Sequence, residues 1–285
     1  GWPVIQSMAV SPYGAHVALG LRRRPPGASS DESWLEVRRI FDGQLELTWR
    51  GGLDIGRVQW APVGRKLSYA STERDKDKRL TTIWLLDLDT QAATPVLNRL
   101  EHLGAYRWLP DGTGIVFDVG QEAEKGKTGI KRVEGLMDRW SYYRDKSALY
   151  LAGVPGGMIR RLTAGGLTAS LDDISPDGRR LLFTRTVEDV SRRPYSRTEL
   201  WELELATSAA RKLRDFGWLS AVCYAPHGRR LLVHAGPTAF GEAGVNVPGG
   251  VIPNESDGEL YIWDPAADIV TPITREFHPA VTGAA

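Results

Sequence analysis

A short stretch near the middle of the chain has the residue types of a phosphate-binding loop. A Gly-Lys-Thr triplet at residues 126–128 follows the apolar run Ile115–Val119, as in loops whose backbone N–H groups and lysine cradle phosphate. The motif needs its first glycine at the place that Gln121 occupies, and no helical pattern follows to supply a helix N-terminus. We therefore interpret the stretch as a charged loop between strands.

The chain contains neither a known motif for a catalytic nucleophile nor the residue spacing of a metal site. There is no G-x-S-x-G nucleophile elbow, and the single Cys223 rules out an intramolecular disulfide. The histidines lack the spacing of metal ligands. They are His16, His102, His227, His234 and His278. The sequence therefore predicts no catalytic residue, no metal site and no cofactor in this chain.

One polar segment places a cation beside an aromatic ring. Arg139 and Trp140 are adjacent within Gln121–Lys146, and an arginine can hold a carboxylate through two parallel hydrogen bonds. They are our leading candidates for ligand binding or gating. In the structural alternative, Trp140 packs between repeats and Arg139 pairs with a neighbouring aspartate.

The elements that must position such residues follow from a phrase that occurs five times. Each copy has a proline, any residue, a glycine and then an apolar-rich run, as in SPDGRRLLFT. The prolines are Pro12, Pro62, Pro110, Pro176 and Pro226, so the steps between them are 50, 48, 66 and 50 residues. Proline presets the first corner of a tight turn, and glycine accepts the left-handed corner. The phrase therefore predicts a turn between the first two strands of each repeat.

A second apolar phrase follows every turn, as in IWLLDLD and LWELELA, and then one more short strand. Four antiparallel strands per repeat of this length are typical of β-propeller blades. We predict an all-β propeller of about five blades, truncated or open. The repeats are approximately 1–50, 51–98, 99–164, 165–214 and 215–274, and 275–285 would begin a further blade.

Composition excludes some classes of partner. The net charge of +1 gives no electrostatic footprint for nucleic acid, and no apolar stretch is long enough to span a membrane. The N-terminus lacks the pattern of a signal peptide, and the compartment stays open. Trp84, Trp201 and Trp263 recur in the second phrase, so we expect them in the core between blades.

The repeats differ in their loops. Long segments lie at Gln121–Lys146, Val187–Arg197 and Ala235–Glu259. Long loops on a rigid scaffold often carry binding residues. The alternative is that they fill the end of the channel or pack on a neighbouring domain.

These repeats and loops resemble a known family. The alternation of SPDGRRLLFT with LWELELATSAARKL resembles TolB-type propellers and the propeller domain of the prolyl oligopeptidase family. The segments EGLMDRWSYYRDKSALYLAGVPGGMIRRLT and GPTAFGEAGVNVPGGVIPNESDGELYIWD are similar to dipeptidyl- and acylaminoacyl-peptidase-like members of that family. The resemblance covers nearly the whole chain.

The resemblance implies a role in substrate access. Such peptidases carry their Ser-Asp-His machinery in an α/β-hydrolase domain, usually C-terminal to the propeller, and the propeller admits only short peptides. This chain contains no such region, so by itself it should not hydrolyse peptides. Dipeptidyl-peptidase relatives hold the substrate N-terminus with a glutamate pair, which makes Glu122 and Glu124 candidates, although their surroundings do not match that motif.

The implied partners are a hydrolase domain of the same protein and short peptides. We also expect the terminal blades to leave uncovered edges, which pairing with another copy of the chain would cover. The competing hypothesis is a stand-alone propeller that binds partner proteins, and a channel-site enzyme is a third. A hydrolase-coding region downstream of Ala285 would distinguish the first two.

Overall fold

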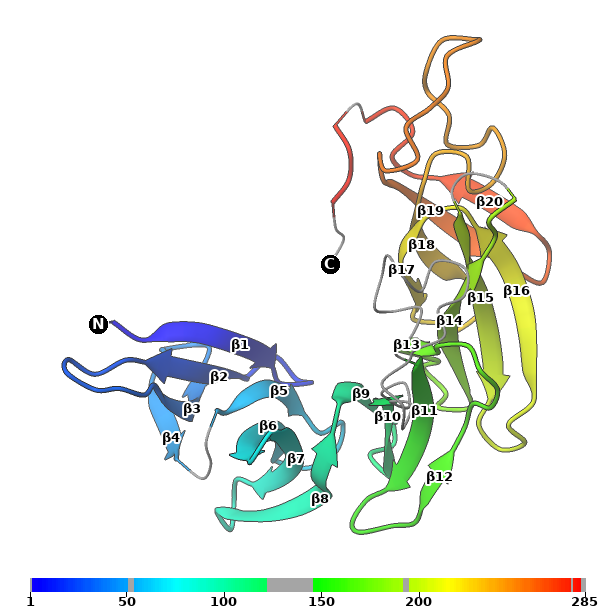
Figure 1. Ribbon diagram of the computed structural model, residues 1–285. Coiled ribbons are helices and arrows are strands. Elements are labelled where there is room, and N and C mark those ends of the chain that lie inside the picture. Colours follow the sequence, from blue (N-terminus) through cyan, green and yellow to red (C-terminus); the bar gives the residue numbers. More distant parts are fainter. Residues whose placement is uncertain (1, 51–53, 122–145, 192–194, 278, 283–285) are drawn as a thin grey trace. The chain divides into compact units, whose positions relative to one another are not determined.

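The computed structural model describes residues 2–50, 54–121, 146–191, 195–277 and 279–282. These residues form strands, turns and loops, and no helix occurs among them. The strands build five antiparallel sheets of four strands each, in which chain neighbours pair in sequence (Figure 1). The predicted all-β propeller class with five four-stranded blades is confirmed.

The strand bounds are as follows. The first blade has β1 (Val4–Val10), β2 (His16–Arg23), β3 (Glu32–Arg39) and β4 (Leu45–Trp49), and the second has β5 (Gly56–Trp60), β6 (Lys66–Asp75), β7 (Lys78–Asp87) and β8 (Ala92–Glu101). The third has β9 (Leu103–Trp108), β10 (Gly114–Gln121), β11 (Lys146–Gly153) and β12 (Ile159–Arg161). The fourth has β13 (Ser170–Ile174), β14 (Arg180–Glu188), β15 (Ser196–Glu204) and β16 (Ala210–Phe216). The fifth has β17 (Leu219–Tyr224), β18 (Leu231–Ala235), β19 (Glu259–Asp264) and β20 (Ile269–Pro272).

The repeated Pro-x-Gly turns join the first and second strands of every blade, as predicted. In the first copy, the Gly14 N–H donates to the Ser11 carbonyl at 2.9 Å, and Gly14 has φ of +69°. The other four glycines also have positive φ. They are Gly64, Gly112, Gly178 and Gly228. Because only glycine enters this region without strain, the turn residue limits where each hairpin can bend.

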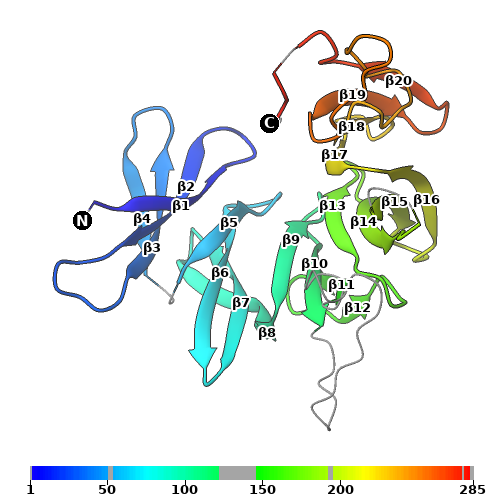
Figure 2. The same ribbon diagram turned by 45° about the horizontal axis from the view of Figure 1, so that its top comes forward.

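The described chain divides into two compact units. Unit 1 comprises Gly1–Gly104, Trp108–Val119 and Leu151–Arg160, and unit 2 comprises Ala105–Arg107, Gly120–Tyr150 and Arg161–Ala285. Figure 2 shows the order of the strands within each sheet from a second direction. Our prediction of an open propeller concerns the relation between these parts and stays a prediction.

In unit 1 the core lies between the first two blades. Leu35 and Val37 of β3 pack with Leu67 and Tyr69 of β6, and all four are nearly sealed from solvent. Trp84, one of the recurring tryptophans, is partly buried against this cluster. Its position agrees with the expected role in the core.

In unit 2 the core lies between the fourth and fifth blades. Phe216 of β16 meets Tyr261 and Trp263 of β19 within one buried cluster, which confirms the expected place of Trp263. Trp201 is half-buried and stacks on Phe183 of its own blade at 6.2 Å. Its expected place between blades stays a prediction.

A second repeated position ties consecutive blades together. The residue two places before the repeated proline is an aromatic in several blades, and it reaches back to the preceding one. Trp60 Nε1 donates to the Ala9 carbonyl at 2.9 Å, and Trp108 Nε1 donates to Ser68 Oγ at 2.8 Å. In unit 2, the Tyr224 hydroxyl donates to Glu202 Oε1 at 3.0 Å.

Candidate functional site

The four residues that the sequence nominated for binding or gating are Glu122, Glu124, Arg139 and Trp140. They lie outside the described residues, so their roles stay predictions. The strands that flank them are described. Strand β10 ends at Gln121 and β11 begins at Lys146, so this long segment joins the second and third strands of its blade.

All the long segments have the same place in their blades. The second-to-third-strand connections are 24–31, 76–77, 122–145, 189–195 and 236–258. Because strands alternate in direction, these connections lie at the opposite end of each blade from the Pro-x-Gly turns. We call this the insertion end. The long segments of the third, fourth and fifth blades all belong to it.

The 236–258 loop, in orange between β18 and β19 in Figure 1, has an anchored base. The Tyr261 hydroxyl donates to the Gly236 carbonyl at 2.9 Å, and the Phe240 ring packs on Tyr261 with centroids 4.9 Å apart. Burial and the nearby Glu259 raise the pKa of Tyr261, so its hydroxyl stays protonated and keeps donating. These contacts hold the first part of the loop to the blade.

The tip of the same loop is apolar and exposed. The Ile252 side chain is 90% exposed and Val251 is 54% exposed. Neighbouring exposed apolar side chains can form part of a contact surface. The loop therefore presents a small apolar contact from a fixed base.

Two adjoining hollows lie at the insertion end of unit 1. One has a volume of about 600 Å³ and is bounded by β2, β3, β6 and β7, and the other, of about 330 Å³, extends toward β9. Asp54 and Arg79 line both, and Arg79 Nη2 donates to Asp54 Oδ2 at 3.0 Å. The walls are dominated by charged side chains, which suits a polar ligand.

A third hollow, in unit 2, lies along the first strands β13 and β17. It has a volume of about 470 Å³ and includes Arg107, Asp172 and His234 among its lining residues. Asp172 is at a register shift between Leu171 and Asp173 in the β13–β14 pairing. Such bulges re-aim side chains, which accounts for the place of the Asp172 carboxyl in the hollow.

The carboxyl of Asp172 is the most perturbed acid in this hollow. Its Oδ2 is sealed from solvent and has no hydrogen-bond partner among the described residues. Burial raises the pKa of Asp172 to about 7, against the opposing effects of Thr184 and Arg107. The neighbouring Asp173 is better satisfied, since its Oδ2 accepts the Tyr224 N–H at 2.9 Å.

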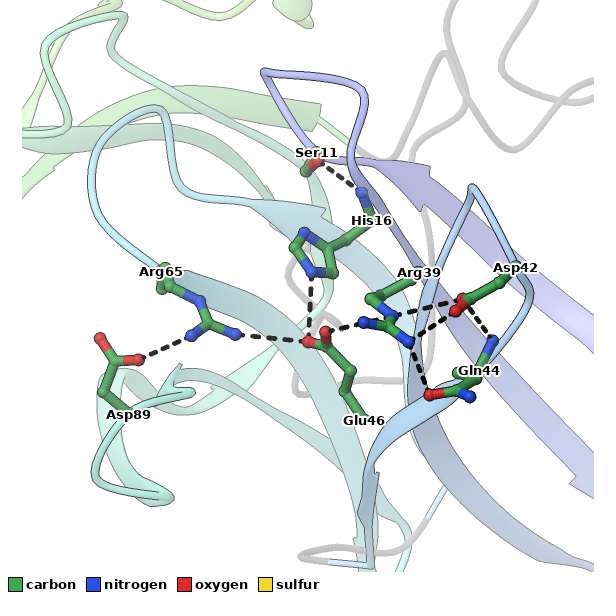
Figure 3. Close-up of polar contacts among 8 residues, drawn as sticks. All are labelled: Ser11, His16, Arg39, Asp42, Gln44, Glu46, Arg65 and Asp89. Carbon is green, nitrogen blue, oxygen red and sulfur yellow. Dashed lines mark hydrogen bonds and ion pairs between the residues drawn. The ribbon is translucent and has the colours of Figure 1, made fainter.

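A charged cluster near the Pro-x-Gly turns of unit 1 has a structural role. Glu46 lies 3.1 Å from His16 Nε2 and 3.3 Å from Arg65 Nη2, and Arg65 continues to Asp89 at 3.1 Å (Figure 3). Every carboxylate in this chain of contacts faces a basic group. The cluster links the first two blades and leaves no charge for a ligand.

No group of three or more His, Cys, Asp or Glu that could hold a metal occurs among the described residues. In the same part of the chain, no helix could span a membrane. Cys223 lies in the unit 2 hollow, but burial raises the pKa of its thiol and disfavours the reactive thiolate.

Sequence reasoning missed the residues that line these hollows. Asp172 and Asp173 form an acidic pair in a short strand just before the fourth turn, in the stretch SLDDISPDG. Two carboxylates in a strand of a blade are an unusual signal that could have been followed. Arg74 and Arg79 carried no such signal, because arginines are frequent in hairpin tips.

Comparison with known proteins supports the fold. No family model matches the chain. The acylaminoacyl peptidase of Pyrococcus horikoshii superposes with a TM-score of 0.71 at 15% identity, over 99% of this chain and 41% of that protein. The β-propeller domain of the Trilobed protease from Pyrococcus furiosus, described as having an open velcro topology, superposes with a TM-score of 0.64 at 14% identity, over 97% of this chain and 72% of that chain.

A curated relative is similar in sequence as well. The uncharacterized peptidase YuxL of Bacillus subtilis (strain 168) is 27% identical over 128 residues, which is 44% of this chain and 16% of that protein. This chain therefore spans well under half the length of the whole peptidases that it matches. The resemblance to propellers of acylaminoacyl peptidases, predicted from the repeats, is confirmed at the level of the fold.

Proposed function

We propose that this chain is the non-catalytic propeller of a serine peptidase of the acylaminoacyl- or dipeptidyl-peptidase type. In this proposal the propeller covers the active site of a hydrolase domain in the same protein and admits only short peptides. The likeness to the acylaminoacyl peptidase propeller over 99% of the chain supports the pairing with a peptidase. The partial identity to a Bacillus peptidase supports it independently.

The observation that carries the orientation is the shared place of the long loops. The 122–145, 189–195 and 236–258 segments all connect second to third strands, so they all belong to the insertion end. We propose that this end faces the substrate chamber and the hydrolase domain. The exposed apolar tip at Val251 and Ile252 would then contact the hydrolase, and Arg139 and Trp140 would border the peptide path.

The first test is the identity of the full-length protein. The gene should encode a G-x-S-x-G-bearing hydrolase region beyond residue 285, and the full-length product should cleave short peptides while the chain of residues 1–285 cleaves none. A gene that lacks such a region would contradict the proposal and favour a propeller that binds partner proteins.

The second test concerns orientation. Replacing Val251 and Ile252 by serine in the full-length peptidase should loosen the contact and let longer peptides be cleaved. The matched control is Phe41→Ser, because Phe41 is 97% exposed but lies in the turn between β3 and β4, at the opposite end of its blade. If Phe41→Ser alters the size limit and the loop variant does not, the orientation is wrong.

The third test concerns the predicted gating residues. Arg139→Ala in the full-length enzyme should raise KM for short peptides or shift the size limit without unfolding the hydrolase domain. Unchanged kinetics with a lower melting temperature would assign Arg139 and Trp140 to structure.

A further inference from the structure

The larger hollow at the insertion end of unit 1 brings three arginines from three strands together. Arg22 comes from β2, Arg74 from β6 and Arg79 from β7, and all three line the same hollow of about 600 Å³. We call it the Arg74 hollow. Its other lining residues are Asp31, Ser33, Asp54, Thr72 and Glu73.

Two of these arginines lie directly opposite each other. In the β6–β7 hairpin, Arg74 is the register partner of Arg79. Like charges at directly opposed positions of a strand pair repel and destabilise the hairpin. Asp54 neutralises Arg79, so the charge of the pair that needs a partner is that of Arg74.

The carboxylates of the hollow are already matched to other arginines. Asp31 accepts from Arg22 Nε at 2.6 Å and from Arg24 Nε at 2.5 Å, and the pKa of Asp31 is held below its usual value by these two guanidinium groups. Asp54 accepts from Arg79, as described above.

Glu73 is matched in the same way, by a residue outside the hollow. It pairs with Arg99 of β8, which also donates to Asp75 Oδ2 at 2.8 Å. Arg99 is thus shared between two carboxylates, and Glu73 has no need of Arg74.

Arg74 is therefore the surplus cation. It is exposed, and it makes no ion pair or hydrogen bond with any residue that the structure describes. Arg74 and Arg79 are register partners, and both line the hollow. A guanidinium presents a planar fork of donors that matches the oxygens of a carboxylate or phosphate.

The backbone near the hollow supports a positioned site. Asp54 has φ of +50°, in the left-handed region, and it lies between Arg79 and Arg22, with Arg22 Nη1 3.9 Å from Asp54 Oδ1. A non-glycine residue in this region costs conformational energy, which the surrounding contacts must offset. Asp54 thereby holds Arg79 in place while Arg74 stays free.

We propose that the Arg74 hollow binds an oxyanion, the carboxylate of a peptide or a phosphate group, through Arg74 and Arg79. This proposal does not depend on the gating role proposed above. Its test measures binding to this chain alone, without a hydrolase domain. Its place at the insertion end would bring a bound peptide carboxylate to the side proposed to face the substrate.

The experiment is calorimetric titration of the purified chain with inorganic phosphate and, separately, with N-acetyl-aspartate, in low-salt buffer. Binding of at least one should be measurable and should weaken steeply as salt is added, because it depends on exposed charges. Binding of phosphate alone would point to a phosphate group, and stronger binding of N-acetyl-aspartate would point to a peptide carboxylate. Absence of binding by both ions would overturn the proposal.

Variants locate the site. Arg74→Gln should reduce affinity at least tenfold, Arg74→Lys should reduce it several-fold by removing the fork of donors, and the control Arg230→Gln should leave it unchanged. Arg230 is a suitable control because it is an exposed arginine at a strand border in unit 2. Equal affinity of the wild type and Arg74→Gln would refute the site.

The melting temperature supplies a second readout that a merely structural role would not produce. Without oxyanion, Arg74→Gln should melt at the same or a higher temperature than the wild type, because it removes the repulsion with Arg79. With saturating oxyanion, the order should reverse, because only the wild type gains stability from the bound ligand. A variant that melts lower under both conditions would mean that Arg74 is structural.

Discussion

At the recurring aromatic position, the two units join their blades through different kinds of chemical group. In unit 1 the pairs at this position are neutral, since Trp60 and Trp108 donate to the Ala9 carbonyl and to the Ser68 hydroxyl. In unit 2, the junction uses carboxylates, since Tyr224 donates its hydroxyl to Glu202 and its N–H to Asp173. The same turn and the same strand order therefore accept either chemistry where blades meet.

The difference extends to how charge is buried. Glu202 is only 7% exposed and is held by Arg180 Nη1 at 3.0 Å and by Arg211 Nη2 at 2.8 Å. The corresponding acceptor in unit 1, Ser68, is fully buried but neutral. Removing one partner of a buried ion pair lowers the free energy of unfolding more than removing one partner of a neutral hydrogen bond. Mutations at these two positions should therefore destabilise unit 2 more than unit 1.

The largest expected effect follows from Glu202. Glu202→Ala leaves Arg180 and the Tyr224 hydroxyl without their acceptor, and the free energy of unfolding should fall by about 3 kcal/mol. The matched change in unit 1, Ser68→Ala, removes one neutral acceptor and should cost about 1 kcal/mol. Urea denaturation followed by tryptophan fluorescence measures both. Equal decreases in the free energy of unfolding for the two variants would contradict the proposed difference between the charged and the neutral junction.

A smaller effect, with a pH dependence, is expected at Asp172. In the native state its pKa is raised to about 7 by burial, whereas the ordinary value is 3.8. The folded protein thus binds the proton more tightly, and the contribution of Asp172 to stability falls as pH rises from about 4 to about 7. Above that range Asp172 is ionised in the folded protein, and its buried charge lowers the free energy of unfolding by the full amount.

Asp172→Asn should remove this dependence. At pH 8 the variant should be more stable than the wild type by about 2 kcal/mol, and at pH 4 the two should differ little. Unfolding curves at the two pH values test the sign directly. A variant that is less stable than the wild type at pH 8 would show that the ionised Asp172 is stabilising. Asp172 lies in unit 2, so the effect should be confined to that unit.

The smallest effect should come from the exposed cluster of unit 1. Glu46→Gln removes the centre of the network in Figure 3, yet its partners are exposed to solvent and salt, and the loss should be below about 0.5 kcal/mol. The difference should vanish in 1 M salt, when screening removes the ion pairs. If Glu46→Gln lowered the free energy of unfolding as much as Glu202→Ala does, the exposed ion pairs of unit 1 would be as stabilising as the buried ones of unit 2, contrary to this prediction.

Much of the fold could be predicted, because its signals are local. Pro62 restricts its own φ, and Gly64 accepts the positive φ that the turn requires, so a turn between two strands follows from the pair itself. Regular spacing then extends the prediction to whole blades. The candidate site was less predictable, and the nominated Arg139 and Trp140 fall in a segment outside the described residues.

By itself the sequence determined the five turns and the order of the strands. These depend on torsional preferences and on the alternation of strand direction, which act over a few residues. Tertiary structure alone decided that Arg74 has no carboxylate partner among the described residues, that Asp172 Oδ2 is sealed from solvent and that Tyr224 reaches Glu202. The physical reason is that burial and charge pairing depend on groups brought together from other strands, as when the Tyr224 hydroxyl donates to Glu202, which is 22 residues away in another blade.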